Sequence, residues 1–237
     1  MKYKSITYDP EPSTIGVKNG VSQLEFYDHF ISEHKNSKKI EEYLIKSDID
    51  FFLNNEQTAK EIDLTGLKGR LYPLANETDL IVFSPMMWGY NYIVSQNFID
   101  SLNEVQVSDE DYTIYSVDIE NAQNRNYYLL FIPIIPSNEV DYVNSILYKR
   151  LRSNASEKKY ITISNFQEYN DLLDDYPFYD FTQLALPSTY KSKHILNIQN
   201  HVDLFLSDEL IDSLQSKNVT NLVIKKHPKL VIQDHSL

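Results

Sequence analysis

Two stretches of the chain place apolar and polar residues in the same order. Residues 92–102 (YIVSQNFIDSL) and 204–214 (LFLSDELIDSL) each run from apolar residues into a serine, then repeat Ile, Asp, Ser and Leu at equal offsets. Such a pattern predicts a short strand followed by a helix that packs one face inward. We expect Ser95 and Ser207 to cap these helices by accepting hydrogen bonds from the first backbone N–H groups.

Helical spacing of apolar residues recurs in two other parts of the chain. Residues 21–46 carry apolar side chains at a 3.6-residue period with charged residues between them, which predicts two helices broken near Asn36. Residues 164–174 follow the same period, and Ser164 stands where an N-terminal cap is expected. We therefore predict a third helix there.

Short runs of β-branched and aromatic residues predict the strands. These runs are residues 70–72, 80–83, 92–94, 112–117, 127–132, 160–163, 194–198, 202–206 and 219–224. Residues 1–20 and 175–193 are typical of loops. Residues 49–53 fit a strand or a helix end, and residues 140–151 fit a strand or a helix.

The order of these elements predicts the fold class. Strands and helices mix without a regular βαβ alternation, and glycine-rich turns between strand and helix are missing. We predict an α+β fold with a mixed or largely antiparallel sheet and flanking helices. The repeated strand–serine–helix unit suggests two similar lobes, residues 1–136 and 137–237, although one continuous domain fits the same pattern.

Charge is distributed unevenly along the chain, which has 34 acidic and 22 basic residues and a net charge of −12. Residues 71–124 hold no lysine or arginine. Their nine acidic residues are Glu77, Asp79, Asp100, Glu104, Asp109, Glu110, Asp111, Asp118 and Glu120. This segment is either a solvated surface that keeps the protein soluble or a docking face for a basic partner. Nucleic acid is not expected as a partner, because phosphate binding needs clustered lysine and arginine.

The main basic cluster is short. It consists of Lys149, Arg150, Arg152, Lys158 and Lys159. We predict an exposed linker or a helix end for it. The chain has no cysteine, no apolar signal segment at its start and no apolar run long enough to span a bilayer as a helix. A soluble cytoplasmic protein without membrane contact or cofactor is therefore expected.

One carboxylate cluster is a candidate for chemistry. It consists of Asp171, Asp174, Asp175 and Asp180. Paired carboxylates can bind a cation or act as acid and base, so a metal-dependent hydrolase is one interpretation. Alternatively, Asp174 and Asp175 end a helix, because the stretch lacks the turn glycine of a calcium loop. The six histidines show no metal-ligand spacing, and no phosphate-binding or nucleophile motif occurs.

The run Met86-Met87-Trp88-Gly89-Tyr90 is the most apolar candidate for an interface. It packs either as a core turn between two strands or as an aromatic anchor for a partner, with Trp88 and Tyr90 in contact.

Several of these motifs resemble those of bacterial polymorphic-toxin immunity proteins, of the kind grouped as immunity families 11 and 43. Residues 83–85, Trp88 and residues 92–98 are similar to a W-s-p…i-i-v-S-e-x-F stretch, and residues 140–145 to an i-D-x-x-x-S element. Residues 202–210 and 219–224 are similar to the closing i-f-v-S-e-x-l…G-l-x-f pattern, with Asn221 where a glycine is common. The resemblance covers residues 79–226.

The resemblance implies a non-enzymatic protein that binds and blocks a cognate toxin, and it carries over no catalytic residue. Combined with the base-free segment, it predicts a basic toxin as partner, with the oligomeric state left open. The residues expected to contact it are Glu104, Asp109, Glu110, Asp111, Trp88 and Tyr90. A scaffold protein without a toxin partner is the alternative from a third class.

Overall fold

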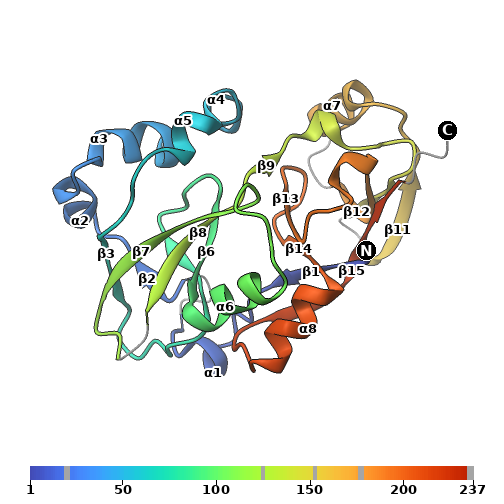
Figure 1. Cartoon of the computed structure of the whole chain (residues 1–237). Helices are drawn as coiled ribbons and strands as arrows, with labels where there is room; N and C mark the ends of the chain where they lie inside the picture. Colours follow the sequence, from blue (N-terminus) through green and yellow to red (C-terminus); the bar gives the residue numbers. More distant parts are fainter. Residues whose placement is uncertain (19–21, 124–125, 152–153, 176–178, 234–237) are drawn as a thin grey trace. The chain divides into compact units, whose positions relative to one another are not determined.

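The structure is a computed structural model of the whole chain (Figure 1). It describes all residues except 19–21, 124–125, 152–153, 176–178 and 234–237. The described chain contains two sheets with helices beside them, and both sheets combine antiparallel and parallel pairs, as β12 with β15 and β3 with β7 show. The predicted α+β fold is confirmed. None of the helices in the described ranges is long and apolar enough to cross a membrane.

The chain divides into two compact units. Unit 1 comprises residues 1–6, 135–208 and 224–237, and unit 2 comprises residues 7–134 and 209–223. The chain therefore passes between the units four times. The lobe boundary predicted at residue 136 lies beside the crossing at residues 134–135, while residues 1–6 join the C-terminal part and residues 209–223 join the N-terminal part.

Unit 1 is built on an eight-stranded sheet in the order β11-β10-β12-β15-β1-β14-β13-β9. Its strands are β1 (Tyr3–Thr7), β9 (Ile134–Ile135), β10 (Ile146–Leu151), β11 (Asn154–Ile161), β12 (Tyr179–Leu186), β13 (Ile195–Ile198), β14 (Leu204–Ser207) and β15 (Val223–Ile232). The helix α7 (Phe166–Asp175) and the 3₁₀ turns η2 (Ser137–Glu139) and η3 (Ser188–Tyr190) complete it. Its core includes Leu147, Leu184 and Phe205, none of which is exposed.

Two segments predicted as loops contribute strands to this sheet, so those predictions are wrong. Residues 1–20 contain β1, which pairs antiparallel with β14, with Tyr3 opposite Ser207. Residues 175–193 contain β12, which pairs with β10 and β15. Tertiary pairing supplies the hydrogen bonds that local sequence does not indicate.

Unit 2 is built on a seven-stranded sheet in the order β4-β6-β8-β7-β3-β2-β5. Its strands are β2 (Leu24–Glu25), β3 (Leu67–Leu71), β4 (Leu80–Ile81), β5 (Phe83–Ser84), β6 (Tyr90–Ser95), β7 (Thr113–Glu120) and β8 (Tyr127–Phe131). Its helices are α1 (Pro12–Ile15), α2 (Asp28–Glu33), α3 (Ser37–Lys39), η1 (Ile40–Ile45), α4 (Ile49–Asn54), α5 (Glu56–Lys60), α6 (Gln96–Glu104) and α8 (Asp208–Ser216).

The seven-stranded sheet closes on itself. Its two end strands, β4 and β5, are separated in the chain by Val82 alone. The Val82 carbonyl accepts hydrogen bonds from Gln23 N (2.8 Å) and Leu24 N (3.2 Å), which continues the pairing of β5 with β2. Residues 80–84 therefore act as one bent strand that pairs with β6 at its start and with β2 at its end.

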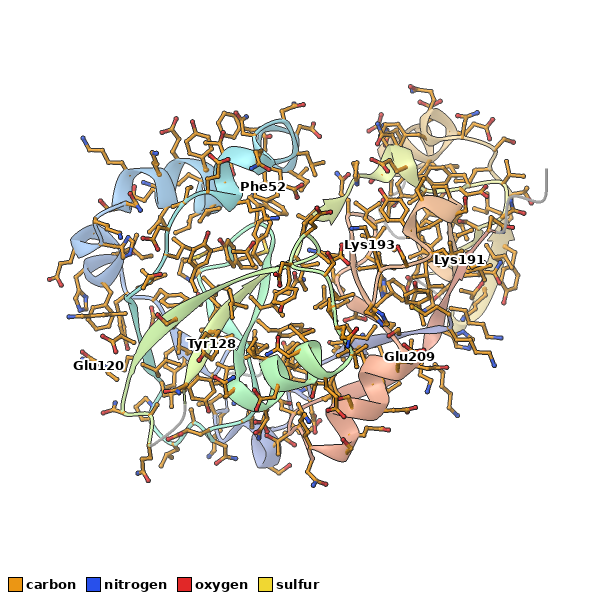
Figure 2. The ribbon with its side chains drawn as sticks, viewed as in Figure 1. Phe52, Glu120, Tyr128, Lys191, Lys193 and Glu209 are labelled. Carbon is orange, nitrogen blue, oxygen red and sulfur yellow. The ribbon has the colours of Figure 1, made fainter. Side chains whose placement is uncertain are left out.

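Short helices cover the core of unit 2. The predicted break near Asn36 separates α2 from α3, and η1, which follows α3 directly, is a π-helix. Residues 49–53 form the helix α4, whose first turn is capped by the Asp48 carboxylate (Phe51 N to Oδ1, 2.7 Å). Phe52 of α4, labelled in Figure 2, is completely buried against Trp88 and Phe131.

Candidate partner-binding surface

The repeated sequence unit is a repeated structure. β6 leads into α6 and β14 leads into α8, as the pattern predicts. In both copies a short strand lies antiparallel to the first one, β4 beside β6 and β13 beside β14. The serine amide donates to the residue that precedes this neighbour strand: Ser95 N to Asp79 O at 3.0 Å, and Ser207 N to His194 O at 2.9 Å.

The predicted role of Ser95 as a helix cap is wrong. Its side chain forms no cap hydrogen bond, and its hydroxyl donates instead to the Asp79 carboxylate (Oδ1, 2.6 Å). Ser207 Oγ lies 2.9 Å from Nδ1 of His194, which holds the position equivalent to Asp79. Each serine thus fixes its strand to the neighbouring strand through a side-chain contact, and the chemistry of that contact differs between the copies.

The repeat also extends beyond residues 102 and 214, to the ends of the two helices. Gln106 and Asn218, 112 residues apart, both have positive φ angles, 58° and 53°. Val107 N donates to Leu102 O and Val219 N donates to Leu214 O, each at 3.0 Å. A left-handed residue with this bond is the Schellman end of a helix, so both copies stop in the same way.

The two helices of the repeat are in contact within unit 2. The Glu104 carboxylate of α6 accepts hydrogen bonds from Ser213 Oγ (2.9 Å) and Lys217 Nζ (2.5 Å), which bracket the end of α8. These bonds hold the pKa of the Glu104 carboxyl below its usual value. Figure 1 shows α6 and α8 beside each other.

The outer sides of these helices form what we call the acidic surface, made by α6, the loop 105–112 that follows it, and residues 209–217. Its exposed carboxylates are Asp100, Glu104, Asp109, Glu110, Glu209 and Asp212. Residues 96–112 and 209–217 contain one lysine and no arginine, and that lysine, Lys217, is bound to Glu104. Lys60 of α5 lies beside the surface, with Nζ 3.5 Å from Glu110 O, and the exposed carboxylates still outnumber the bases. The potential over this surface is therefore negative.

The structure separates the acidic residues that were predicted to bind a partner. Glu104, Asp109 and Glu110 are exposed and belong to the acidic surface, whereas Asp111 is only 7% exposed. Glu209 and Asp212 were missed because they come from the other half of the chain. The signal was present in the repeat, in which Asp212 stands at the position of Asp100.

The predicted aromatic anchors, Trp88 and Tyr90, are less exposed than the carboxylates of the acidic surface. Tyr90 is 3% exposed and packs edge-on against Phe131, with ring centroids 5.0 Å apart. Its hydroxyl has no hydrogen-bond partner among the described residues, and burial raises its pKa well above the usual value. Trp88 is half-buried, and its indole N–H donates to Ser47 O (2.8 Å). Of the run 86–90, Met86 is the exposed member, at 65%.

Other carboxylates of residues 71–124, the segment without lysine or arginine, have partners from elsewhere in unit 2. Glu120 of β7, labelled in Figure 2, accepts from Arg70 Nε (2.7 Å) on the adjacent strand β3. Lys68 of β3 stands in register with Asp118. The segment is therefore not uniformly negative, because β3 places two bases beside its last two acids. The acidic surface lies at α6 and the loop after it.

The alternative carboxylate cluster falls around α7. Asp171 accepts from Gln167 Nε2 (2.8 Å), and Asp180 accepts from the Tyr148 hydroxyl (3.2 Å). Residues 176–178, between these acids, lie outside the described residues. In the part of the chain that the structure describes, no group of three or more His, Asp or Glu side chains is arranged to hold a metal ion.

Among the described residues, a serine, a histidine and an aspartate lie together in unit 1. Ser5 Oγ and His201 Nε2 both lie 3.4 Å from the same Asp203 oxygen, and Lys225 Nζ binds it at 2.5 Å. A catalytic triad needs the two histidine nitrogens to contact different partners, whereas Nε2 of His201 faces both the aspartate and the serine (3.3 Å). Ser5 is fully buried, so the network joins β1, β14 and β15 as a structural element.

The basic cluster is a hairpin, so its prediction as a linker or helix end is wrong. Lys149 and Lys159 are paired on β10 and β11, and Arg150 stands opposite Lys158. Lys158 Nζ lies 4.2 Å from the centre of the Tyr148 ring, a cation–π contact. Arg152 lies outside the described residues.

Comparisons of the chain with protein families, with curated proteins and with solved structures find no match.

Proposed function

We propose that this protein neutralises a basic bacterial toxin in the cytoplasm by binding and occluding it, without catalysis, as an immunity protein does. The acidic surface is the observation that carries the proposal, because it joins carboxylates from two distant parts of the chain and contains one base, already bound to Glu104. The resemblance of residues 79–226 to immunity proteins supports the same function.

The acidic surface would act mainly on the rate of association. Exposed carboxylates attract a basic partner over about 8 Å at physiological salt, which raises the encounter rate and orients the partner. An interface of roughly 1,600 Å² then sets the dissociation rate through packed contacts rather than through charge. Binding by this route weakens as salt is added.

Charge reversal tests the proposal. The first step is to search the neighbouring reading frames for a secreted protein with a C-terminal toxin domain. The measurement is the association kinetics of such a domain with this protein at low and at physiological salt. The variant Asp109→Lys/Glu110→Lys is expected to slow association several-fold at low salt, and less at higher salt.

A matched control changes the net charge equally at two other exposed positions, with Glu33→Lys in unit 2 and Asp174→Lys in unit 1. It is expected to retain most of the association rate. Equal rates for the two double variants would overturn the acidic surface as the docking face, and absence of any binding to such a domain would overturn the immunity function.

A further inference from the structure

The π-helix η1 produces an unusual feature of the surface of unit 2. Lys46 N donates to Glu41 O (2.8 Å), five residues earlier, and this wide turn buries Ile40 and Leu44 completely. Glu41 and Lys46 remain outside and form an ion pair across the turn. π-helical turns are rare and are often found at functional sites.

Two depressions flank this ion pair. One, of about 560 Å³, is lined by Lys38, Glu41, Glu42, Lys46, Ser47, Asp48 and Phe51. The other, of about 410 Å³, is lined by Asp28, His29, Ile31, Ser32, Glu41, Ile45, Lys46 and Pro85. Glu41 and Lys46 line both, so the ion pair is the wall between them.

The larger depression has an aromatic floor. Phe51 is 38% exposed and packs against Tyr43, with ring centroids 5.5 Å apart. Its backbone is fixed, because Phe51 N donates to Asp48 (2.7 Å) and Ser47 O accepts from the Trp88 indole (2.8 Å). The backbone that carries the Phe51 ring is therefore held by contacts within unit 2.

The charges at the rim favour a cation. Three carboxylates and two lysines line the larger depression, and one of each is consumed in the Glu41–Lys46 pair. Asp48 caps α4 through Oδ1, and Glu42 forms no ion pair with the described residues. An aromatic ring beside an unpaired carboxylate suits a long cationic side chain, whose stem covers the ring while its head meets the carboxylate.

We infer that this depression binds an arginine side chain of the protein partner. The planar guanidinium stacks on the Phe51 ring and donates to Glu42 or Asp48, which a lysine ammonium does with poorer geometry. The inference rests on the proposed function in one respect, namely that the natural partner is a basic protein. The site itself is defined by the described residues of unit 2.

Short peptides test the site without the toxin. The blocked tripeptide Gly-Arg-Gly is titrated into the whole protein, with Gly-Lys-Gly and the uncharged Gly-citrulline-Gly as matched probes, and backbone and aromatic NMR shifts are followed. The arginine peptide is expected to shift signals of Tyr43, Ser47 and Phe51, with affinity at least several-fold above that of the citrulline peptide.

Three variants locate the effect. Glu42→Gln and Phe51→Leu are each expected to weaken binding of the arginine peptide several-fold, whereas Asp174→Asn, at an exposed position of unit 1, leaves its affinity unchanged. The inference would be overturned if the citrulline peptide bound equally well or if the shifts were confined to the acidic surface. It would also be overturned if Glu42→Gln and Phe51→Leu both left the affinity unaltered. These outcomes do not touch the proposed function, which is judged by toxin association with the Asp109/Glu110 variant.

Discussion

The copy formed by β6 and α6 and the copy formed by β14 and α8 share their backbone but not their chemistry. In both, a serine ends the strand, the helix buries the same four positions, and a left-handed residue ends the helix. The residue across from the serine is a buried aspartate in the first copy and a half-buried histidine in the second. The apolar pattern therefore determines the path of the chain, while side-chain contacts depend on the surroundings of each copy.

In the first copy the aspartate has contacts beyond the neighbouring strand. Asp79 is 2% exposed, and its carboxylate accepts from Ser95 Oγ as well as from Thr220 N (2.8 Å) and Thr220 Oγ1 (2.6 Å). Thr220 follows α8 in the chain, so the aspartate connects the start of one helix with the end of the other. The Ser207–His194 contact joins β14 to the residue that precedes β13.

Truncation of the two equivalent leucines is expected to have the largest effect on stability, and it tests whether the two copies pack alike. Leu102→Ala and Leu214→Ala each remove a side chain with 0% exposure, so each is expected to lower the unfolding free energy by about 3 kcal/mol. Urea denaturation measures both. Val202→Ala, at a position that is 83% exposed, serves as the control and should change little. A difference of more than about 2 kcal/mol between the two leucines would show that the copies are not equivalent in packing.

Substitutions of Asp79 and His194, the residues opposite the two serines, should lower the unfolding free energy by unequal amounts. Asp79→Asn replaces an acceptor of four donors, Ser95 Oγ, Asn97 Nδ2, Thr220 N and Thr220 Oγ1, by an amide that presents N–H groups to them, and is expected to cost about 2 kcal/mol. His194→Gln removes the ring nitrogen that contacts Ser207 Oγ and should cost about 0.5–1 kcal/mol. Denaturation midpoints of both variants, with Asp100→Asn as an exposed control, measure the difference. Equal losses would contradict the stronger attachment of the first copy.

Glycine substitutions at the ends of the two helices are expected to have the smallest effects, and to raise the unfolding free energy rather than lower it. Gln106→Gly is expected to stabilise the protein by up to about 1 kcal/mol, because glycine adopts positive φ without steric cost. Asn218→Gly should gain less, since asparagine tolerates the left-handed region better than glutamine. Asn103→Gly, inside α6, should instead destabilise. Thermal unfolding of the three variants distinguishes them, and a loss of stability in Gln106→Gly would contradict the shared Schellman end.

Periodic apolar residues were sufficient to predict several elements. The strand predicted at residues 127–132 is β8, and the helix predicted after Ser207 is α8. The predicted final strand, residues 219–224, instead begins at Val223 and continues to Ile232 through Pro228. A proline near the start of an apolar stretch hides a strand from propensity rules, although it is tolerated where its missing N–H is not needed.

The remainder depended on contacts between distant parts of the chain. Ser95 has the sequence signature of a cap, but its hydroxyl donates to the charged Asp79 carboxylate instead of accepting from the first backbone N–H groups of the helix. The acidic surface required knowing that α8 lies against α6, since Asp212 is 112 residues from Asp100 in the chain. The arginine site depends on a π-turn, which has no apolar period of its own.

The position of β1 has a consequence for synthesis of the chain. Its two neighbours in the sheet, β14 and β15, are synthesised roughly two hundred residues later than β1. Residues 3–7 therefore have no partner strand until that distant part of the chain has been made, so this side of the eight-stranded sheet forms late in folding.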